Sequence, residues 1–100
     1  MNIQNTDAQT AVVTGLQELV AANATQIRDE IRVALPATCV NLDLDLSTLR
    51  FLDSSGLGTL VSLHKTLRSR HGAVRLIQPA ANIRQVLELT RLHRVFEIIS

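Results

Sequence analysis

The chain has no tryptophan and no tyrosine, and Phe51 and Phe96 are the only phenylalanines among its 100 residues. Proteins that bind single-stranded nucleic acid stack the bases on aromatic side chains, and two phenylalanines cannot supply such a platform. The chain also lacks an excess of positive charge, because its formal net charge at pH 7 is +1. Nucleic-acid-binding domains usually show a marked basic bias. We therefore predict no direct contact with nucleic acid.

Cysteine is equally scarce, since Cys39 is the only one and cannot form an internal disulfide. It begins an apolar run, where a buried free thiol is the ordinary expectation. A chain without disulfides fits a reducing compartment. Residues 1–10 are polar and do not resemble a signal peptide, and no apolar run approaches the roughly 20 residues of a membrane helix. We predict a cytoplasmic protein without membrane insertion.

Hydrophobic residues make up 46% of the chain, which is enough for one modest core at this length. We predict one domain over residues 1–100, in which residues 1–9 are frayed or form an edge strand. Apolar positions alternate in some segments and recur at threes and fours in others, which are the periods of strands and helices. The predicted strands are residues 10–14, 16–20, 40–46 and 74–77, a further strand is expected near 96–99, and the predicted helices are 23–35, 57–67 and 83–90.

Three local features refine this outline. Asn23 and Gln26 have the spacing of a reciprocal helix cap, so Asn23 is expected to accept a hydrogen bond from the first helical turn. Gly72 is expected to end the helix that starts near residue 57. Phe51 is expected to pack under the short connection before that helix. Strands that alternate with helices predict an α/β fold with a mostly parallel sheet.

The segment from Asp53 to Gly58, with the sequence Asp-Ser-Ser-Gly-Leu-Gly, joins a buried strand to a helix. It does not have the spacing of a phosphate-binding loop or a dinucleotide fingerprint. A catalytic triad of Asp53, Ser54 and His64 is excluded, because a helix from Ser55 to His64 has nine residues at about 1.5 Å each and places the histidine roughly 13 Å away. His71 and His93 stand too far apart in the sequence to indicate a metal site. We predict a protein that is not an enzyme and that has no metal or cofactor.

The same segment allows two interpretations of its serines. Asp, Ser and Gly before an apolar helix are typical of a helix cap, which would be a purely structural role. Alternatively, an exposed serine hydroxyl near a helix N-terminus can accept a phosphate without breaking the fold. Gly58 is either a close-packing position or a gap that lets a partner approach. Asp43 and Asp45 either lie on the solvent-exposed face of a strand, or Asp45, which is nearer the end of the strand, forms part of a partner surface.

Three parts of the sequence resemble the STAS domain family, and in particular bacterial anti-sigma-factor antagonists. They are Leu44-Asp45-Leu46-Ser47, Phe51-Leu52-Asp53-Ser54-Ser55-Gly56-Leu57-Gly58, and Leu89-Thr90-Arg91-Leu92 followed by Val95-Phe96-Glu97-Ile98. The resemblance implies an α/β, STAS-like fold: a mixed, mostly parallel sheet of about four to five strands flanked by helices on one side. Two positions depart from the family pattern, because Val20 replaces an acidic residue and Arg91 replaces a glycine.

The resemblance also implies a function. An unphosphorylated antagonist sequesters an anti-sigma factor that is also a serine kinase, phosphorylation releases it, and a PP2C-type serine phosphatase resets the switch. The phosphoacceptor of the family corresponds to Ser54, and the expected partner-binding residues are Asp45, Asp53, Ser55, Gly56 and Gly58. The alternative is a STAS accessory subunit of a lipid-type ABC transporter, which would bind the transporter ATPase without phosphorylation.

Overall fold

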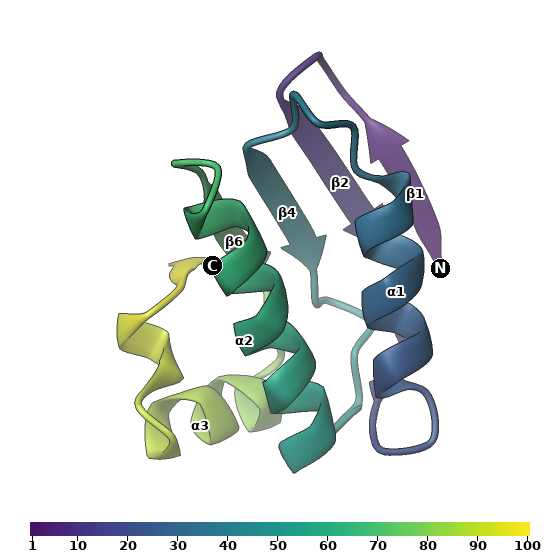
Figure 1. The fold of residues 1–100 in the computed structure, drawn as a ribbon. Coiled ribbons are helices and arrows are strands. Elements are labelled where there is room, and N and C mark those ends of the chain that lie inside the picture. The colour runs from purple at the N-terminus through teal and green to yellow at the C-terminus, as the bar shows by residue number, and fades with distance from the viewer.

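The computed structural model describes residues 1–100 and contains a five-stranded sheet with the order β1-β2-β4-β6-β7. β1 pairs antiparallel with β2, and the other neighbours are parallel. α1 and α2 lie side by side across one face of this sheet, and α3 lies near one end (Figure 1). The bounds are β1 Asn2–Asn5, β2 Thr10–Thr14, β3 Glu18–Leu19, α1 Ala24–Ala34, β4 Asn41–Asp45, β5 Phe51–Leu52, α2 Ser54–Arg68, β6 Ala73–Ile77, α3 Ala81–Leu89, the 3₁₀ turn η1 Leu92–Arg94, and β7 Glu97–Ile99.

This architecture confirms the predicted α/β class, the mixed and mostly parallel sheet, and the placement of helices on one side. The first residues form an edge strand, which was one of the two expected outcomes for residues 1–9. The segment predicted as strand 16–20 contains the short strand β3, and the terminal apolar run ends in β7. The predicted sequence of elements is therefore correct apart from β5 and the 3₁₀ turn η1, which no pattern indicated.

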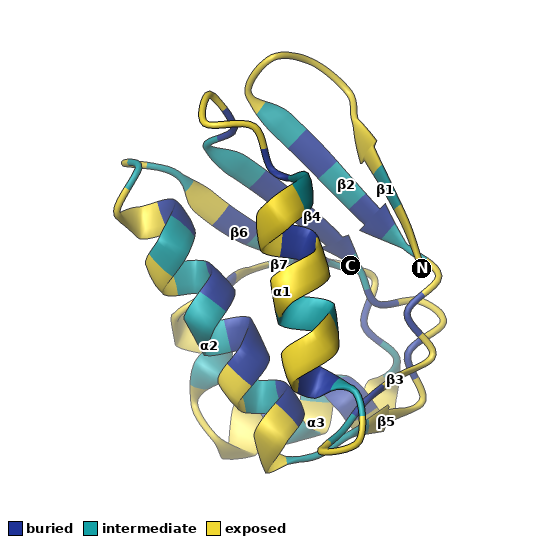
Figure 2. Cartoon of the chain, turned by 45° about the vertical axis from the view of Figure 1, so that its right-hand side comes forward, coloured by how far each residue is buried: buried dark blue, intermediate teal, exposed yellow.

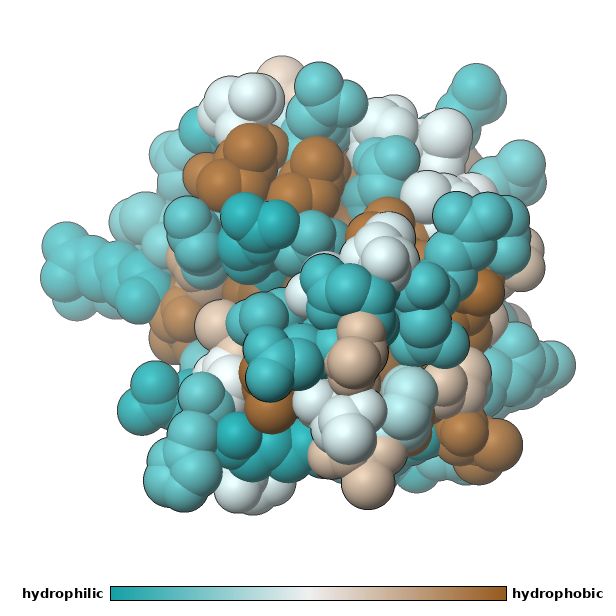
Figure 3. All heavy atoms as spheres, turned by 90° about the horizontal axis from the view of Figure 1, so that it is seen from above, coloured by the Kyte–Doolittle hydropathy of each residue, from teal (hydrophilic) through white to brown (hydrophobic).

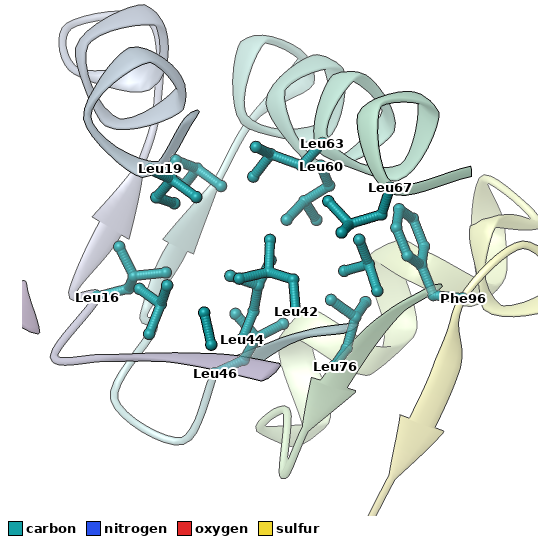
Figure 4. Packing of buried hydrophobic residues seen from close by; sticks show 14 of the residues in the cluster. Leu16, Leu19, Leu42, Leu44, Leu46, Leu60, Leu63, Leu67, Leu76 and Phe96 are labelled. Atoms are coloured by element: carbon teal, nitrogen blue, oxygen red, sulfur yellow. The ribbon is translucent and has the colours of Figure 1, made fainter. Parts of the chain in front are cut away.

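Leucine side chains from the strands and from α2 meet between the sheet and the helices (Figure 4). Leu42, Leu44 and Leu46 alternate along β4 and its end, so all three point to the same side of the sheet, toward the helices. On α2, the leucines recur at intervals of three and four residues, at Leu60, Leu63 and Leu67. They therefore line one face of the helix, which packs against the leucines of β4. Buried residues accordingly form stripes on the inner faces of the elements (Figure 2).

The opposite face of the sheet holds one ion pair, in which the carboxylate is buried and the guanidinium side chain is partly exposed. Asp43 is only 8% exposed, and its two oxygens accept hydrogen bonds from Nε and Nη2 of Arg75 at 2.7 Å each. The two residues are direct neighbours across β4 and β6. The interpretation of Asp43 as a solvated strand residue is therefore wrong, because the guanidinium covers its carboxylate. Asp45, at the end of the same strand, is only half-buried.

α1 begins at Ala24 as predicted, but Asn23 does not cap it with its side chain. Its Oδ1 accepts a hydrogen bond from the backbone N–H of Val20, and its Nδ2 donates to the carbonyl oxygen of Glu18, both at 2.9 Å. The predicted reciprocal cap with Gln26 is therefore wrong. The amide of Asn23 instead closes the loop between β3 and α1, because both groups of its side chain are used on backbone atoms that precede the helix.

α2 ends at Arg68, four residues before Gly72, so the prediction that Gly72 terminates this helix is wrong. The residue in the left-handed region is His71, with φ of 61°. Gly72 is needed for a different reason, since a Cβ there would overlap the backbone carbonyl of Val40. The glycine thus allows the chain to enter β6 directly beside the start of β4.

Candidate functional site

The segment from Asp53 to Gly58 lies at the end of the sheet to which the arrows of β2 and β4 point (Figure 1). β4, β2 and β6 are parallel, so their carboxyl ends meet at this edge, which is the usual position of binding sites in open α/β sheets. Ser54 is the first residue of the 15-residue helix α2, and both Ser54 and Ser55 are exposed. The structure therefore presents two hydroxyl groups to solvent at the N-terminus of a long helix.

Asp53 is the N-cap of α2, and its carboxylate holds two separate parts of the chain. Oδ1 accepts a hydrogen bond from the backbone N–H of Gly56, and Oδ2 accepts one from the backbone N–H of Ala21, both at 2.9 Å. These bonds, first the one from Gly56 and then the one from Ala21, lower the pKa of Asp53 below its ordinary value because they stabilise the ionised form. The helix-cap interpretation thus applies to Asp53, and neither serine side chain caps the helix.

The two glycines of the segment have different surroundings. Gly56 is buried, and a Cβ there would overlap the carbonyl oxygen of Leu19 and a methyl group of Leu52. Gly58 is exposed, and no atom lies within 4 Å of the position that its Cβ would occupy. Close packing is therefore the role of Gly56, while Gly58 leaves open space one helical turn after Ser54, on the same side of α2.

The loop between β3 and α1, residues 20–23, lies beside the start of α2 because Asp53 binds Ala21. Val20, the position at which an acidic residue was expected, therefore belongs to the surroundings of Ser54. Sequence patterns did not show this proximity, because Ala21 and Asp53 are 32 residues apart and the bond uses a backbone group. The side chain of Val20 is half-buried and carries no charge.

Asp45 organises the connection that leads from β4 to α2. Its Oδ1 accepts a hydrogen bond from the backbone N–H of Ser47 at 2.9 Å, which forms a turn directly after the strand. Thr48 continues this connection and donates its hydroxyl to the carbonyl oxygen of Leu16 at 2.8 Å. Asp45 therefore lies at the same edge of the sheet as Asp53, but its visible role is to fix the turn.

The prediction that Phe51 packs under this connection is wrong, because its side chain is 63% exposed. β5 pairs with β3, and Phe51 lies opposite Glu18 in that pair. A hollow of about 800 Å³ opens next to it, with walls formed by Gln17 and Glu18, by residues 47–51, and by Ala80 and Asn82. Phe51 is three residues before Ser54 along the chain. The sequence patterns did not indicate this hollow.

His64 lies away from the serines, further along α2. Its ring packs edge-to-face on Phe96, with centroids 5.3 Å apart, and its buried Nδ1 has no hydrogen-bond partner. Burial, followed by the charge of Arg68, lowers the pKa of His64. His64 lies ten residues after Ser54 along α2, a rise of roughly 15 Å, so its half-buried imidazole does not reach the Ser54 hydroxyl.

No three histidine, cysteine, aspartate or glutamate side chains come together in a group that could hold a metal ion. None of the helices combines the length and the apolar character that crossing a membrane requires. At the end of the molecule opposite the serines, hydrophobic residues appear as small groups between hydrophilic ones (Figure 3).

The site consists of two exposed serines at the start of a helix that Asp53 caps, at the edge where the parallel strands end. The model of the STAS domain matches residues 2–100, so the chain belongs to the STAS domain family. An anti-sigma-B factor antagonist of Listeria monocytogenes is 28% identical over 81 residues, which cover 81% of this chain and 71% of that protein. A protein of the same description from Listeria innocua has the same identity and coverage.

Solved structures share the fold. The anti-sigma factor antagonist SpoIIAA in its unphosphorylated form superposes with a TM-score of 0.84 at 23% identity, covering 99% of this chain and 87% of that one. An anti-sigma factor antagonist from Mycobacterium paratuberculosis gives a TM-score of 0.83 at 23% identity, covering 98% and 82%. The resemblance to STAS domains and to antagonists of anti-sigma factors is thus confirmed. Such antagonists are regulatory binding proteins and not enzymes, in agreement with the sequence-based expectation.

Proposed function

We propose that this chain is a phosphorylation-switched antagonist of an anti-sigma factor and that it works in the cytoplasm. In its unphosphorylated form it sequesters an anti-sigma factor that is also a serine kinase. The kinase transfers a phosphate to Ser54, the complex weakens, and a PP2C-type serine phosphatase removes the phosphate again. The relatives that are antagonists of anti-sigma factors support the first step.

The observation that carries the proposal is the position of Ser54. Its side chain is exposed on the first residue of α2, directly after Asp53. The helix N-terminus favours negative charge there, so a phosphate at Ser54 leaves the fold intact. The phosphate adds about −1.5 to −2 charges next to the charge of Asp53. A partner surface that fits the neutral hydroxyl would then face a strong concentration of negative charge. Binding would also require the phosphate to lose its water, which costs free energy.

The other expected partner-binding residues divide into two groups under this proposal. Ser55 and Gly58 are exposed beside Ser54 and would touch the partner directly. The other three residues would position these exposed groups without touching the partner. Asp45 fixes the turn after β4, Asp53 caps α2, and Gly56 allows the close packing of the helix start. This division supports the view that the docking surface is preformed in the free protein.

The test is a titration of the purified protein with purified anti-sigma-type serine kinases from the genome that encodes it. We expect tight binding of wild type and at least tenfold weaker binding of Ser54→Asp. Ser69→Asp is the matched control, because Ser69 is an exposed serine at the far end of the same helix, and circular dichroism checks the fold of both variants. Equal affinities of wild type and Ser54→Asp would refute the switch. Binding to a lipid-transporter ATPase with indifference to Ser54→Asp would establish the alternative function.

A further inference from the structure

Both edges of the five-stranded sheet are open in the single chain, because β1 forms one edge and β7 forms the other. An open edge presents backbone N–H and carbonyl groups that pair with any suitable strand. Proteins usually protect such edges with charged residues, proline, bulges or a covering element. Figure 1 shows β1 as the outermost strand, with no helix beyond it. The protection that each edge carries therefore decides which of them can accept a further strand.

The edge at β7 is protected. This strand has only three residues, and Glu97, the first of them, is exposed. Two copies that paired here about a twofold axis would bring their glutamates close together, and like charges across strands are unfavourable. The end of the chain is also engaged, because Nη2 of Arg84 on α3 donates a hydrogen bond to Oγ of Ser100. We therefore expect no strand to add at β7.

The edge at β1 lacks each of these protections. Its four residues, Asn2–Asn5, and the following Thr6 carry no charge and include no proline. All four residues pair with β2 in an unbroken register, so no bulge bends the strand away. Ile3 is half-buried and packs against the core, while the other three residues of the strand are exposed. β1 is therefore a regular strand whose outer side is open to a partner.

The hairpin that contains β1 is ordered within the single chain. The backbone N–H of Thr6 donates to the carbonyl oxygen of Thr10 at 3.0 Å, which closes the turn after the strand. Asp7 is the nearest charged side chain, and its Oδ1 accepts a hydrogen bond from the backbone N–H of Gln9 at 2.7 Å inside the turn. A strand that is already ordered loses little conformational freedom when another strand pairs with it.

A second copy of this chain is the occupant that fits this edge. Two β1 strands related by a twofold axis run antiparallel, so the N–H and carbonyl groups of each meet the complementary groups of the other. Asn2 and Gln4 share the side of the sheet opposite Ile3. In such a pair, Gln4 of one copy faces Asn2 or Gln4 of the other, and each amide can both donate and accept. A charged peptide has no opposite charge to meet on this strand.

We propose that two copies of this chain pair through their β1 strands and join their sheets into one continuous sheet. The twofold axis is then perpendicular to the sheet, so α1 and α2 of both copies cover the same face. β2 and β4 of one copy run opposite to those of the other, which places the two Ser54 residues at opposite ends of the dimer. Both serines stay accessible, and the dimer does not depend on the proposed function.

The test is sedimentation velocity of the purified full chain at rising concentration. Strands this short bury less than the roughly 1,600 Å² of a standard interface, so we expect monomer near about 10 μM and dimer near about 1 mM. Gln4→Lys and Gln4→Glu should each raise the dimer Kd by about tenfold or more, because like charges meet near the axis. An equimolar mixture of the two variants should restore the dimer, since opposite charges then meet.

Gln85→Lys is the matched control, because Gln85 is exposed on α3, on the other side of the molecule from β1. Circular dichroism checks the fold of all variants. Wild type that stays monomeric at the highest concentration would refute the dimer. So would a dimer that both Gln4 variants leave unchanged, a mixture that stays monomeric, or an equal loss in Gln85→Lys. Each of these results leaves the phosphorylation switch standing, and a protein that binds no kinase can still form this dimer.

Discussion

The carboxylate of Asp53 accepts a hydrogen bond from the backbone N–H of Ala21, 32 residues earlier in the chain. The same carboxylate caps α2 through Gly56, so one side chain joins the loop 20–23 to the helix that presents Ser54. The surface around the serine is thus composed of two segments, and this ionised group joins them in addition to the pairing of β3 with β5. A change at Asp53 should therefore alter both segments, although the residue itself stands next to only one of them.

Asp53→Asn should loosen the loop 20–23. An asparagine has one acceptor oxygen in place of two, so it keeps one of the two hydrogen bonds and gives up the other. We expect a lower thermal midpoint of unfolding and faster hydrogen exchange at the amide of Ala21, measured by NMR. Asp29→Asn is the control, because Asp29 is an exposed residue of α1 whose only ion pair is with its neighbour Arg28. Unchanged exchange at Ala21 in Asp53→Asn would show that the hydrogen bond does not hold the loop.

Acid should weaken the fold through the same carboxylate. The pKa of Asp53 is lower in the folded protein, so its contribution to stability is present above the unfolded value of about 3.9 and is lost as pH falls through the folded pKa. We expect the stability of wild type to fall more steeply below about pH 4 than that of Asp53→Asn. Unfolding midpoints measured across this range test the difference, and parallel curves would contradict it.

The two glycines of the helix start should respond in opposite ways to alanine. Gly56→Ala should destabilise the protein by about 2 kcal/mol, because the new methyl group overlaps the carbonyl of Leu19. Gly58→Ala should stabilise it by about 0.5–1 kcal/mol, because the site is open and alanine favours the helix. Chemical denaturation of both variants measures the pair. A similar loss in both would mean that the helix start has no room at either position.

Arg91 occupies a position at which a glycine is expected, and the structure gives the reason for that expectation. Its φ is 60°, in the left-handed region that glycine adopts without strain. Arg91→Gly should therefore raise the free energy of unfolding by about 1 kcal/mol. Arg94→Gly is the control, because it removes an exposed arginine from the 3₁₀ turn η1, where the backbone is right-handed, and it should give no gain. Equal effects of the two substitutions would argue against backbone strain at Arg91.

His64 should make the protein less stable in mild acid. Its pKa is lowered in the folded state by burial and by Arg68, and its buried Nδ1 has no acceptor for a proton. The unfolded chain therefore takes up a proton first, so stability falls as pH drops through the unfolded value of about 6.5. We expect a smaller decrease between about pH 7.5 and about pH 5.5 in His64→Phe, which keeps an aromatic contact with Phe96. An unchanged pH dependence in that variant would rule out His64 as the cause.

The sequence predicted the long, periodic elements well, because their signal extends over several turns or pleats. The alternation that ends at Leu46 and the apolar stripe of α2 are examples. β5 was missed because it has two residues, which are too few to show a period. The exposure of Phe51 follows from this, since a ring in an unrecognised strand could not be assigned to a face.

The remaining errors share a physical cause, which is competition from groups that are distant in the sequence. Asn23 has the pattern of a cap, but its side chain is used by Val20 and Glu18 on the preceding loop. Asp43 has the pattern of a solvated residue, but Arg75 on the neighbouring strand covers it. The motif at Ser54 could be located from the sequence because it is contiguous. The parts of the site that come from the loop 20–23 and the hollow could not, because pairing across the fold brings them there.

The most direct test of the central claim is to locate the phosphate. The purified protein is incubated with the serine kinase that binds it and with ATP, the modified residue is identified by mass spectrometry, and the binding titration is repeated on the product. We predict a single phosphate on Ser54, no phosphate on the Ser54→Ala variant, retained phosphorylation of Ser55→Ala, and at least tenfold weaker binding of the phosphorylated protein. A phosphate on another residue, or a phosphorylated protein that binds the kinase as tightly as before, would contradict the account.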